Sequence, residues 1–423
     1  MRKMLENKLA RFAKAVLRRE KPQIVAVTGS VGKSSAKEAI AVVLAKRFRV
    51  RASAKNYNTE IGLPLAILDL PSGDRSGLKW LGILWKAWGR AMTKNDDYPK
   101  VLVLEMALQH PADIAKLCDI APPDVAVVTA IGESHLEFMG TKDAIIKEKR
   151  IVVERLPKEG VAVLNRDDEN VWAMRMKTKA RVLSYGFHEE ADVRALPESI
   201  TYACSPDREC GMHFKLTAGG ATVPVFLPHV LGKHGIYAAL AAAAVGTAKD
   251  MNLVEVSDGL GLYSPPPGRL RYVAGIKHTV IIDDSYNSAP TSALAALEVL
   301  RDIPMPDTVK RIAVLGDMLE LGSDSEDGHR RVGIKAAHSA DVLVFVGERM
   351  RDAMKAAAGE GAGEERSFWF ATPEEAGRFV QERMKMGDYI LVKGSRGMRM
   401  EKVVKEIMAE PLDADRLLVS HVE

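Results

Sequence analysis

The chain has 423 residues, and its length predicts two packed domains rather than one core. Hydrophobic residues make up 47% and charged residues 27%, which is typical of soluble globular proteins. The formal net charge of +4 is too small to indicate a nucleic-acid-binding surface. Cys118, Cys204 and Cys210 have no CxxC spacing and cannot all pair, which favours a reducing compartment. Because no segment has the roughly 20 apolar residues of a membrane span, and the N-terminus lacks a secretory apolar region, we expect a cytoplasmic protein.

Residues 1–22 predict a basic amphipathic helix. Leu5, Leu9, Phe12 and Val16 recur at helical spacing, and residues 1–20 hold seven Lys or Arg against two Glu. We expect this helix to pack on the body of the protein; contact with an acidic membrane surface is the alternative.

Short β-branched runs then alternate with helical patterns, which predicts an α/β fold with a mainly parallel, doubly wound sheet. The strand-like runs are IVAVTG (24–29), VLVLEMA (101–107), VAVVTAIG (125–132) and VAVLN (161–165). Residues 180–230 change to an alternating pattern that predicts antiparallel strands, and an Ala-rich helix follows at 235–249. A central domain is therefore expected over residues 23–266.

The proline-rich segment SPPPGRLR, residues 264–271, predicts a stiff hinge between domains. Beyond it, apolar strands alternate with helices again, so residues 267–423 predict a second, Rossmann-like α/β domain. The low-complexity segment 355–365 is expected to be a surface loop.

An insertion at about 75–95 holds three of the five tryptophans. Helical spacing places Leu81, Leu84, Trp85, Trp88 and Met92 on one face, with basic residues beside them. Tryptophan and basic residues on an amphipathic helix suit a membrane interface or a partner groove. Docking on the body of the protein is the expectation that we prefer.

A glycine-rich turn follows the first apolar strand and opens a helix. Its spacing is GxxGKS and not GxxxxGKS, because Val27 stands where the longer form has its first glycine. Backbone N–H groups in such a turn can surround phosphate oxygens, while Lys33 reaches the terminal phosphates and Ser34 binds Mg²⁺. A structural turn is the alternative. The residues assigned to nucleotide binding are Gly29, Ser30, Val31, Gly32, Lys33, Ser34 and Ser35.

Several segments together resemble one family, the Mur ligases, which form amide bonds with ATP in cell-wall peptide assembly. They cover nearly the whole chain in the family's order: VTGSVGKSSAKE (27–38), NYNTEIGLPLAIL (56–68), LEMALQHPADI (104–114), TAIGESHLEFMG (129–140), AVLNRDDENV (162–171), GRLR (268–271), DDSYNSAP (283–290), RIAVLGDMLELG (311–322) and LVKGSRGMRME (391–401). DDSYNSAP, GDMLELG and VKGSRGMRME are most similar to the branch that adds D-alanyl-D-alanine to the UDP-muramoyl-tripeptide.

The resemblance implies a ligase that transfers the ATP γ-phosphoryl group to a carboxylate, after which an amine displaces phosphate. Metal ligands and cations should dominate such a site, because phosphoryl transfer depends on positioning and charge neutralisation. Lys33 would neutralise the β and γ phosphates, and Ser34 with Glu105 would hold one Mg²⁺. His135 would hold a second Mg²⁺, and Lys149 matches a lysine that family members carry as a carbamate. Without the resemblance, Glu105 and Lys149 would be read as solvent-facing side chains and His135 as a structural histidine.

The resemblance also assigns residues outside the glycine turn. Arg269 matches a contact with the ATP phosphates, or anchors the proline hinge. Asp284 matches a contact on the ribose side, or caps a turn. The residues matched to the acyl substrate are Asn56, Asn58 and Thr59, and those matched to the amino component, or to a stabilised turn, are Lys393, Ser395 and Arg396.

Two features depart from the family pattern. Only 23 residues precede IVAVTG. This branch has about eighty there, which form a UDP-binding domain, so the expected binding domain for the nucleotide-sugar end is missing. Either another protein supplies it, or the acyl substrate is carried differently, for instance on a lipid near a membrane. Gly235 and Ala238 stand where the family has asparagines near adenine.

We therefore expect a monomeric ligase that uses ATP and two Mg²⁺ ions, acts on small peptide substrates and binds no nucleic acid. A folate or poly-γ-glutamate ligase is one alternative. A non-catalytic subunit of an amidotransferase is another, although three scattered cysteines do not supply the four of a zinc ribbon.

Overall fold

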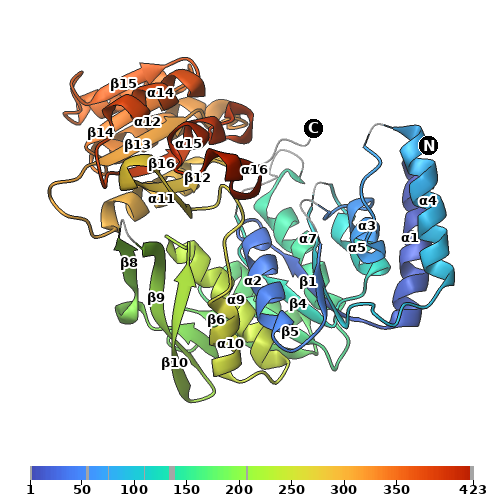
Figure 1. Cartoon of the computed structure of the whole chain (residues 1–423). Coiled ribbons are helices and arrows are strands. Elements are labelled where there is room, and N and C mark those ends of the chain that lie inside the picture. Colours follow the sequence, from blue (N-terminus) through green and yellow to red (C-terminus); the bar gives the residue numbers. More distant parts are fainter. Residues whose placement is uncertain are drawn as a thin grey trace. The chain divides into compact units, whose positions relative to one another are not determined.

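The computed structural model describes residues 2–53, 57–74, 76–108, 110–132, 139–205 and 208–419, with only the backbone of residues 205, 208 and 209. Two compact units are present (Figure 1). The first comprises residues 1–200, 214–226 and 236–263, and the second comprises residues 201–213, 227–235 and 264–423. Each unit is built on a sheet of mainly parallel strands, as the alternation of strand and helix patterns predicted.

The first unit contains seven neighbouring strands in the order β2-β3-β1-β4-β5-β6-β7, and each pair is parallel. They are β1 (Gln23–Thr28), β2 (Val50–Ala52), β3 (Val101–Glu105), β4 (Val125–Val128), β5 (Val161–Asn165), β6 (Arg181–Gly186) and β7 (Val193–Ala195). Strand β9 (Arg208–Ala218) runs antiparallel to β7, and β10 (Ala221–Pro228) lies beyond β9. The antiparallel strands expected over residues 180–230 therefore begin only after β7, because β6 pairs in parallel with β5 and β7 in parallel with β6.

Helices cover both faces of this sheet. The helices are α1 (Arg2–Glu20), α2 (Lys33–Ala45), α3 (Gly62–Leu68), α4 (Gly77–Met92), α5 (Asp113–Ile120), α7 (Lys142–Glu154), α8 (Glu169–Ala173), α9 (Lys233–Ala248) and α10 (Leu253–Leu260). A short 3-10 turn spans Met174–Lys177 and another spans Pro197–Ser199. On one face, Ile24, Leu102 and Ala126 pack with apolar side chains of α1, α3, α5 and α7. Because strand side chains alternate, the equally buried Val25 and Val103 point to the other face.

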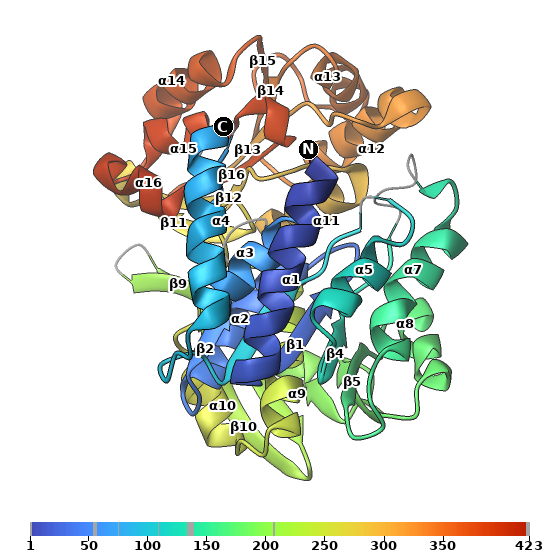
Figure 2. The ribbon, with the colours of Figure 1, turned by 90° about the vertical axis from the view of Figure 1, so that its right-hand side faces the viewer.

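The N-terminal segment forms the expected amphipathic helix, α1, and it lies beside α4 (Figure 2). Leu9, Ala13 and Val16 are buried in the same core cluster as Ile83 of α4. The ends of the two helices are also joined, since the Arg19 guanidinium donates to the carbonyl oxygen of Ala91 at 2.7 Å.

The insertion helix α4 is docked on the body of the unit through one face only. Ile83 and Ala87 are buried, and Trp80, Leu84 and Ala91 are half-buried against the same core. Leu84 therefore belongs to the docked face, which differs from the expectation that it shares the face of Trp85 and Trp88. None of the helices within the described ranges has the length and apolar content to cross a membrane.

The second unit has the sheet order β11-β12-β16-β13-β14-β15, with only β11 antiparallel to its neighbour. Its strands are β8 (Thr201–Ser205), β11 (Arg271–Ala274), β12 (Val280–Asp284), β13 (Arg311–Gly316), β14 (Val342–Val346), β15 (Ser367–Phe370) and β16 (Tyr389–Lys393). Its helices are α11 (Pro290–Asp302), α12 (Ser325–Ala337), α13 (Met350–Gly359), α14 (Pro373–Arg383), α15 (Glu401–Ile407) and α16 (Ala414–Leu417), with 3-10 turns at Ile276–His278, Gly322–Asp324, Arg396–Met398 and Pro411–Asp413. Two separate apolar clusters, one on each face, give the expected Rossmann-like layering.

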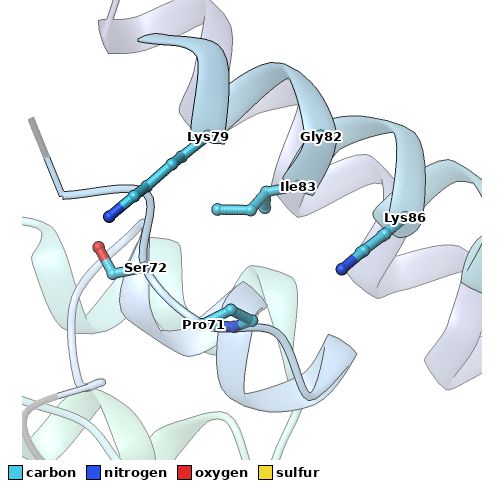
Figure 3. Close-up of a pocket in the computed structure, with 6 residues that line it drawn as sticks. All are labelled: Pro71, Ser72, Lys79, Gly82, Ile83 and Lys86. Atoms are coloured by element: carbon cyan, nitrogen blue, oxygen red, sulfur yellow. The ribbon is translucent and has the colours of Figure 1, made fainter. Parts of the chain in front are cut away.

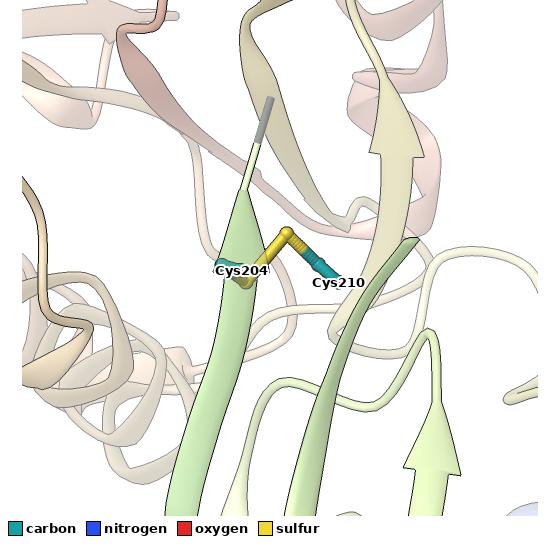
Figure 4. Close-up of a disulfide and its surroundings, with 2 residues drawn as sticks. All are labelled: Cys204 and Cys210. Carbon is teal, nitrogen blue, oxygen red and sulfur yellow. A yellow bond between two sulfur atoms is a disulfide. The ribbon is translucent and has the colours of Figure 1, made fainter. Parts of the chain in front are cut away.

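Two further details differ from what the sequence indicated. Residues 355–359 belong to α13 and not to a loop, because Lys-Ala-Ala-Ala has high helix propensity and the segment ends only at the glycines. Cys204 and Cys210 form a disulfide between β8 and β9 (Figure 4), although their spacing did not predict it; strand pairing brings their Cα atoms to 4.2 Å. Cys118 is a buried free thiol.

Candidate active site

The glycine turn links β1 to the first turn of α2 in the first unit. Gly29 has φ +148° and Gly32 has φ +82°, backbone conformations that residues other than glycine rarely adopt. Gly32 is the N-cap of α2, and no side chain caps this helix end in the described part of the chain. The N-terminal amides of α2 therefore face a position suited to an anion, where the helix dipole adds favourable potential.

Residues after β4 hold the turn in this shape. The Thr129 hydroxyl donates to the carbonyl oxygen of Val31 at 2.6 Å, and the Ser30 amide donates to the carbonyl oxygen of Ala130 at 2.7 Å. A Cβ atom at Gly29 would lie 2.0 Å from the Thr129 hydroxyl oxygen, so this position requires glycine. The turn is thus pre-shaped by the neighbouring parallel strand.

A hydroxyl and a carboxylate meet beside this turn. Ser34 Oγ donates to Glu105 Oε2 at 2.8 Å, and the Asn58 amide donates to Glu105 Oε1 at 3.0 Å. Glu105 is the last residue of β3 and is only 3% exposed, so its carboxylate is not the solvent-facing group of the alternative interpretation. Parallel pairing of β1 with β3 brings Glu105 to the level of Val27, just before the turn.

Lys149 is fully buried on α7 and points at the same turn. Its ammonium donates to the carbonyl oxygen of Gly29 at 2.8 Å. Burial lowers the pKa of Lys149 to about 7, and the nearby positive charge of Lys33 contributes to this shift. The negative charges of Glu148 and Glu105 oppose it. A neutral amine is therefore accessible near neutral pH, and the alternative of a solvated lysine on a helix face is excluded by its burial.

The structure does not test every assigned residue of this unit. His135 and Asn56 lie outside the described residues. Thr59 lies at the start of α3, where its hydroxyl accepts a long hydrogen bond of 3.4 Å from the Gly62 amide and its carbonyl accepts one from Leu63. This places Thr59 in a helix-initiating turn.

In the second unit, Asp284 and Lys393 form an ion pair. They are the last residues of the adjacent parallel strands β12 and β16 and lie in register. Lys393 Nζ donates to Asp284 Oδ2 at 2.5 Å and to the carbonyl oxygen of Asn287 at 2.9 Å, while the Leu270 amide donates to Asp284 Oδ1. Both side chains are mostly buried, so the pair organises the loop ends at this edge of the sheet.

Arg269 and Arg396 approach the same aromatic ring. The Arg269 guanidinium lies 4.0 Å from the centre of the Tyr286 ring and that of Arg396 lies 5.9 Å from it. Ser395 is buried, and its hydroxyl accepts from the Leu319 amide at 2.8 Å and donates to the carbonyl oxygen of Ser288. Ser395 thus ties three loops together, in keeping with the stabilised-turn alternative.

Gly235 and Ala238 occupy positions with little free space. A Cβ atom at Gly235 would lie 2.2 Å from a methyl carbon of Val230, and Ala238 is only 3% exposed. An asparagine at Gly235 would require Val230 to move, so the departure from the family pattern has a local packing reason.

Sequence reasoning missed several residues that shape these sites. Lys37 is buried one turn after Lys33 and donates to the carbonyl oxygen of Ser53 at 2.6 Å. The buried Glu148 carboxylate accepts from the amides of Ala112 and Ile114 and so caps α5. Thr129 directly follows β4 and Tyr286 lies two residues after β12, and that position after a strand was the only signal in the sequence that could have found them.

The oxygen atoms of Ser34 and Glu105 are suitable ligands for magnesium. Ser34 Oγ and the Glu105 carboxylate are hard ligands of the kind that Mg²⁺ prefers, and Mg²⁺ normally completes its shell with water and substrate phosphates. Within the described ranges no cluster of three or more His, Cys, Asp or Glu residues is present. The arrangement can hold a nucleoside triphosphate with its metal and place cations around it.

Comparison with known proteins identifies the family. Residues 89–246 match the Mur ligase middle domain, and residues 268–396 match the Mur ligase glutamate ligase domain. The chain is 30% identical to the UDP-N-acetylmuramoyl-tripeptide–D-alanyl-D-alanine ligase of Bacillus subtilis over 407 residues, covering 96% of this chain and 80% of that one. It is 33% identical to the enzyme of that name from Mycobacterium tuberculosis, covering 92% and 73%. Among solved structures, MurF ligase from Thermotoga maritima in complex with ADP superimposes with a TM-score of 0.74 at 26% identity, covering 95% and 83%. The chain therefore belongs to the Mur ligase family.

Proposed function

We propose that this protein is an ATP-dependent ligase that joins the terminal carboxylate of a UDP-N-acetylmuramoyl-tripeptide to the amino group of D-alanyl-D-alanine in peptidoglycan precursor synthesis. The observation that carries the proposal is the convergence of Lys33, Ser34, Glu105 and Lys149 on one glycine turn. The names of the relatives supply the substrates. Residues 23–266 would bind ATP, and residues 267–423 would complete the site.

The reaction has two steps. First, a carboxylate oxygen of the peptide attacks the γ-phosphorus, the bond to the β-phosphate oxygen breaks, and ADP leaves. The amine then attacks the carbonyl carbon of the acyl phosphate, inorganic phosphate leaves, and the nitrogen loses a proton to give the amide. Both steps concentrate negative charge on oxygen, so the protein's main contribution is to position and neutralise it.

In this scheme the glycine turn and the first turn of α2 bind the phosphates through backbone amides. Lys33 lies next to that turn and neutralises the terminal phosphates; its Nζ now donates to the carbonyl oxygen of Ser30 at 3.2 Å. Ser34 and Glu105 would hold one metal ion, and the hydrogen bond from Asn58 orients the Glu105 carboxylate. Magnesium, when bound, neutralises the phosphate charge that would repel the attacking carboxylate.

Lys149 is proposed to carry a carbamate. Its neutral amine attacks carbon dioxide, a C–N bond forms, one oxygen takes the electron pair of the broken π bond, and the nitrogen releases a proton. The lowered pKa of Lys149 supports this step because only the neutral amine is nucleophilic. The resulting anion, together with His135, would hold a second magnesium ion at the acyl end. Arg269 would contact the phosphates from the C-terminal part of the chain, and its stacking on Tyr286 keeps its guanidinium oriented.

The test is a coupled measurement of ADP release and of product mass by mass spectrometry. ADP release should require both UDP-N-acetylmuramoyl-tripeptide and D-alanyl-D-alanine, and the product mass should equal their sum minus water. Parallel reactions with a folate plus glutamate, and with a lipid-linked muramoyl peptide, separate the alternative ligases. If no acceptor elicits ADP release, a non-catalytic subunit replaces the proposal. Glu105→Gln is the inactive reference, and Glu159→Gln, on an exposed loop, is its matched control.

A further inference from the structure

Helix α4 exposes an apolar stripe along its whole length. Its members are exposed by 52% to 83%: Leu78, Leu81, Trp85, Trp88 and Met92. Helical spacing places all five on one side, while Ile83 and Ala87 bury the opposite side in the core. A continuous exposed apolar surface of this kind marks a contact site more often than an idle surface.

The tryptophans of α4 differ in their surroundings. The Trp80 indole N–H donates to the carbonyl oxygen of Asp74 at 3.1 Å, and its ring packs against Gly73. Trp80 therefore anchors the helix to the preceding loop. Trp85 and Trp88 are 73% and 52% exposed, so the stability of the unit does not explain them.

Positive charge is concentrated on α4 and its neighbour α1. Together the two helices hold ten Lys or Arg and two Glu, whereas the whole chain has a net charge of only +4, so the remainder is net negative. Helix α4 has three basic residues and no acidic one. Exposed cations of α1 include Lys3, Lys8 and Arg11. The helix pair is therefore attracted to a negatively charged surface.

Two lysines of α4 also border a small cavity beside the stripe. The cavity holds about 250 Å³ between α4 and the loop before it, and Figure 3 shows Lys79 pointing toward Ser72 and Lys86 pointing toward Pro71. A separation of seven residues puts both lysines on the same side of the helix. Lys79 lies 3.7 Å from the Asp74 carboxylate, and Lys86 has no acidic partner within the described residues. Two ammonium groups and a hydroxyl suit a phosphate group.

We propose that α4, supported by α1, docks on the surface of an anionic lipid bilayer. The stripe from Leu78 to Met92 enters the boundary between head groups and acyl chains, and Lys79 and Lys86 bind lipid phosphates. Exposed tryptophans with basic flanks on an amphipathic helix fit such an interface, and the excess of cations selects a negatively charged one. A second copy of this chain would bring the same cations together, so the charge argues against self-association through this face. The proposal does not depend on the proposed ligase function.

The experiment measures binding of the full-length protein to vesicles by flotation. Vesicles of phosphatidylglycerol mixed with phosphatidylcholine are compared with vesicles of phosphatidylcholine alone, at low and high salt. We expect binding only to the anionic vesicles, weakened at least about tenfold at high salt. Trp85→Gln/Trp88→Gln and Lys79→Gln/Lys86→Gln should each weaken it by about tenfold or more. Met176→Gln/Leu262→Gln removes two equally exposed apolar side chains elsewhere in the same unit and should leave binding unchanged.

Three results would overturn the proposal. They are equal binding to neutral and anionic vesicles, absence of binding to either, and binding that the α4 variants leave unchanged. Light scattering measures the oligomeric state and so tests whether a second copy covers this face. If the wild type binds no vesicles but forms a dimer that dissociates in Trp85→Gln/Trp88→Gln, the face belongs to a second copy. Far-UV circular dichroism of each variant checks that the fold is kept, which the exposure of these side chains predicts.

Discussion

Lys149 Nζ donates to the carbonyl oxygen of Gly29 at 2.8 Å, which ties helix α7 to the glycine turn that opens α2. Gly29 and Lys149 are 120 positions apart in the sequence, yet both lie in the first unit, and the buried lysine is where α7 meets the turn after β1. This contact joins the proposed metal-directing group directly to the proposed phosphate-binding turn. Substitution of Lys149 or of Gly29 should therefore affect both metal binding and phosphate binding.

Replacement of Lys149 should abolish turnover. Lys149→Ala removes the nucleophile for carbon dioxide and should lower kcat by at least about 100-fold, an effect typical of losing a positioned electrostatic group. Removing carbon dioxide from the buffer should slow the wild type reversibly, and adding bicarbonate should restore it. Lys147→Ala, at an exposed position of the same helix, is the control. Wild-type rates in Lys149→Ala would eliminate the carbamate.

The titration of Lys149 should also be visible in stability. Its pKa is about 7 in the folded protein and near 10.5 in the unfolded chain, so between these values the unfolded chain binds more protons. The free energy of unfolding therefore rises with pH across that window. In carbon dioxide-free buffer, wild type relative to Lys149→Met should gain on the order of 2 kcal/mol between pH 7 and pH 9. Urea unfolding at several pH values measures this; parallel pH curves for the two proteins would contradict it.

Glu105→Gln should separate metal binding from folding. The glutamine oxygen can accept from the Asn58 amide while its NH2 group donates to Ser34 Oγ, so only the charge is lost and the free energy of unfolding should change by less than about 1 kcal/mol. Magnesium-dependent ATP binding, measured by calorimetry, should weaken by at least about tenfold because a hard anionic ligand is gone. Glu159→Gln should behave as wild type. Unchanged ATP affinity in Glu105→Gln would remove Glu105 from the metal site.

Gly29→Ala should damage the turn. The added methyl group would meet the Thr129 hydroxyl oxygen at 2.0 Å, and φ +148° is strained for alanine, so destabilisation of about 2 kcal/mol or more is expected. Thermal unfolding and ATP affinity would both report it. Gly359→Ala, where nothing lies within 4 Å of an added Cβ, is the matched control. A fully stable, ATP-binding Gly29→Ala protein would show that the turn tolerates another conformation.

The Asp284–Lys393 pair should be more sensitive to single than to double replacement. Lys393→Met leaves a buried carboxylate without its cation and should cost about 3 to 5 kcal/mol of unfolding free energy. Asp284→Asn/Lys393→Met removes both charges and should recover part of that loss. Urea unfolding of the wild type, Asp284→Asn, Lys393→Met and the double variant gives the coupling energy between the two charges. Additive effects would mean that the two groups do not interact in solution.

Much of the outcome was already determined by local sequence. Alternating apolar runs and helical periodicities specify parallel strands with helices between them, because each period buries one side of its element. The glycines before Lys33 indicate a turn that only glycine adopts readily. Their position between a strand and a helix indicates that the turn binds phosphate. The order of the family's motifs identified the remaining candidate residues, including Glu105 and Lys149, without any coordinates.

Tertiary structure alone decided what those residues do to one another. Nothing local in the sequence pairs Ser34 with Glu105, lowers the pKa of Lys149 or sets Asp284 against Lys393, because each effect depends on burial and on strands that are distant in the chain. Helical periodicity also did not predict which side chains of α4 are covered. It grouped Leu84 with Trp85 and Trp88, although Leu84 packs on the core. Periodicity gives only the approximate direction of each side chain around the helix axis, and packing determines which side chains are covered.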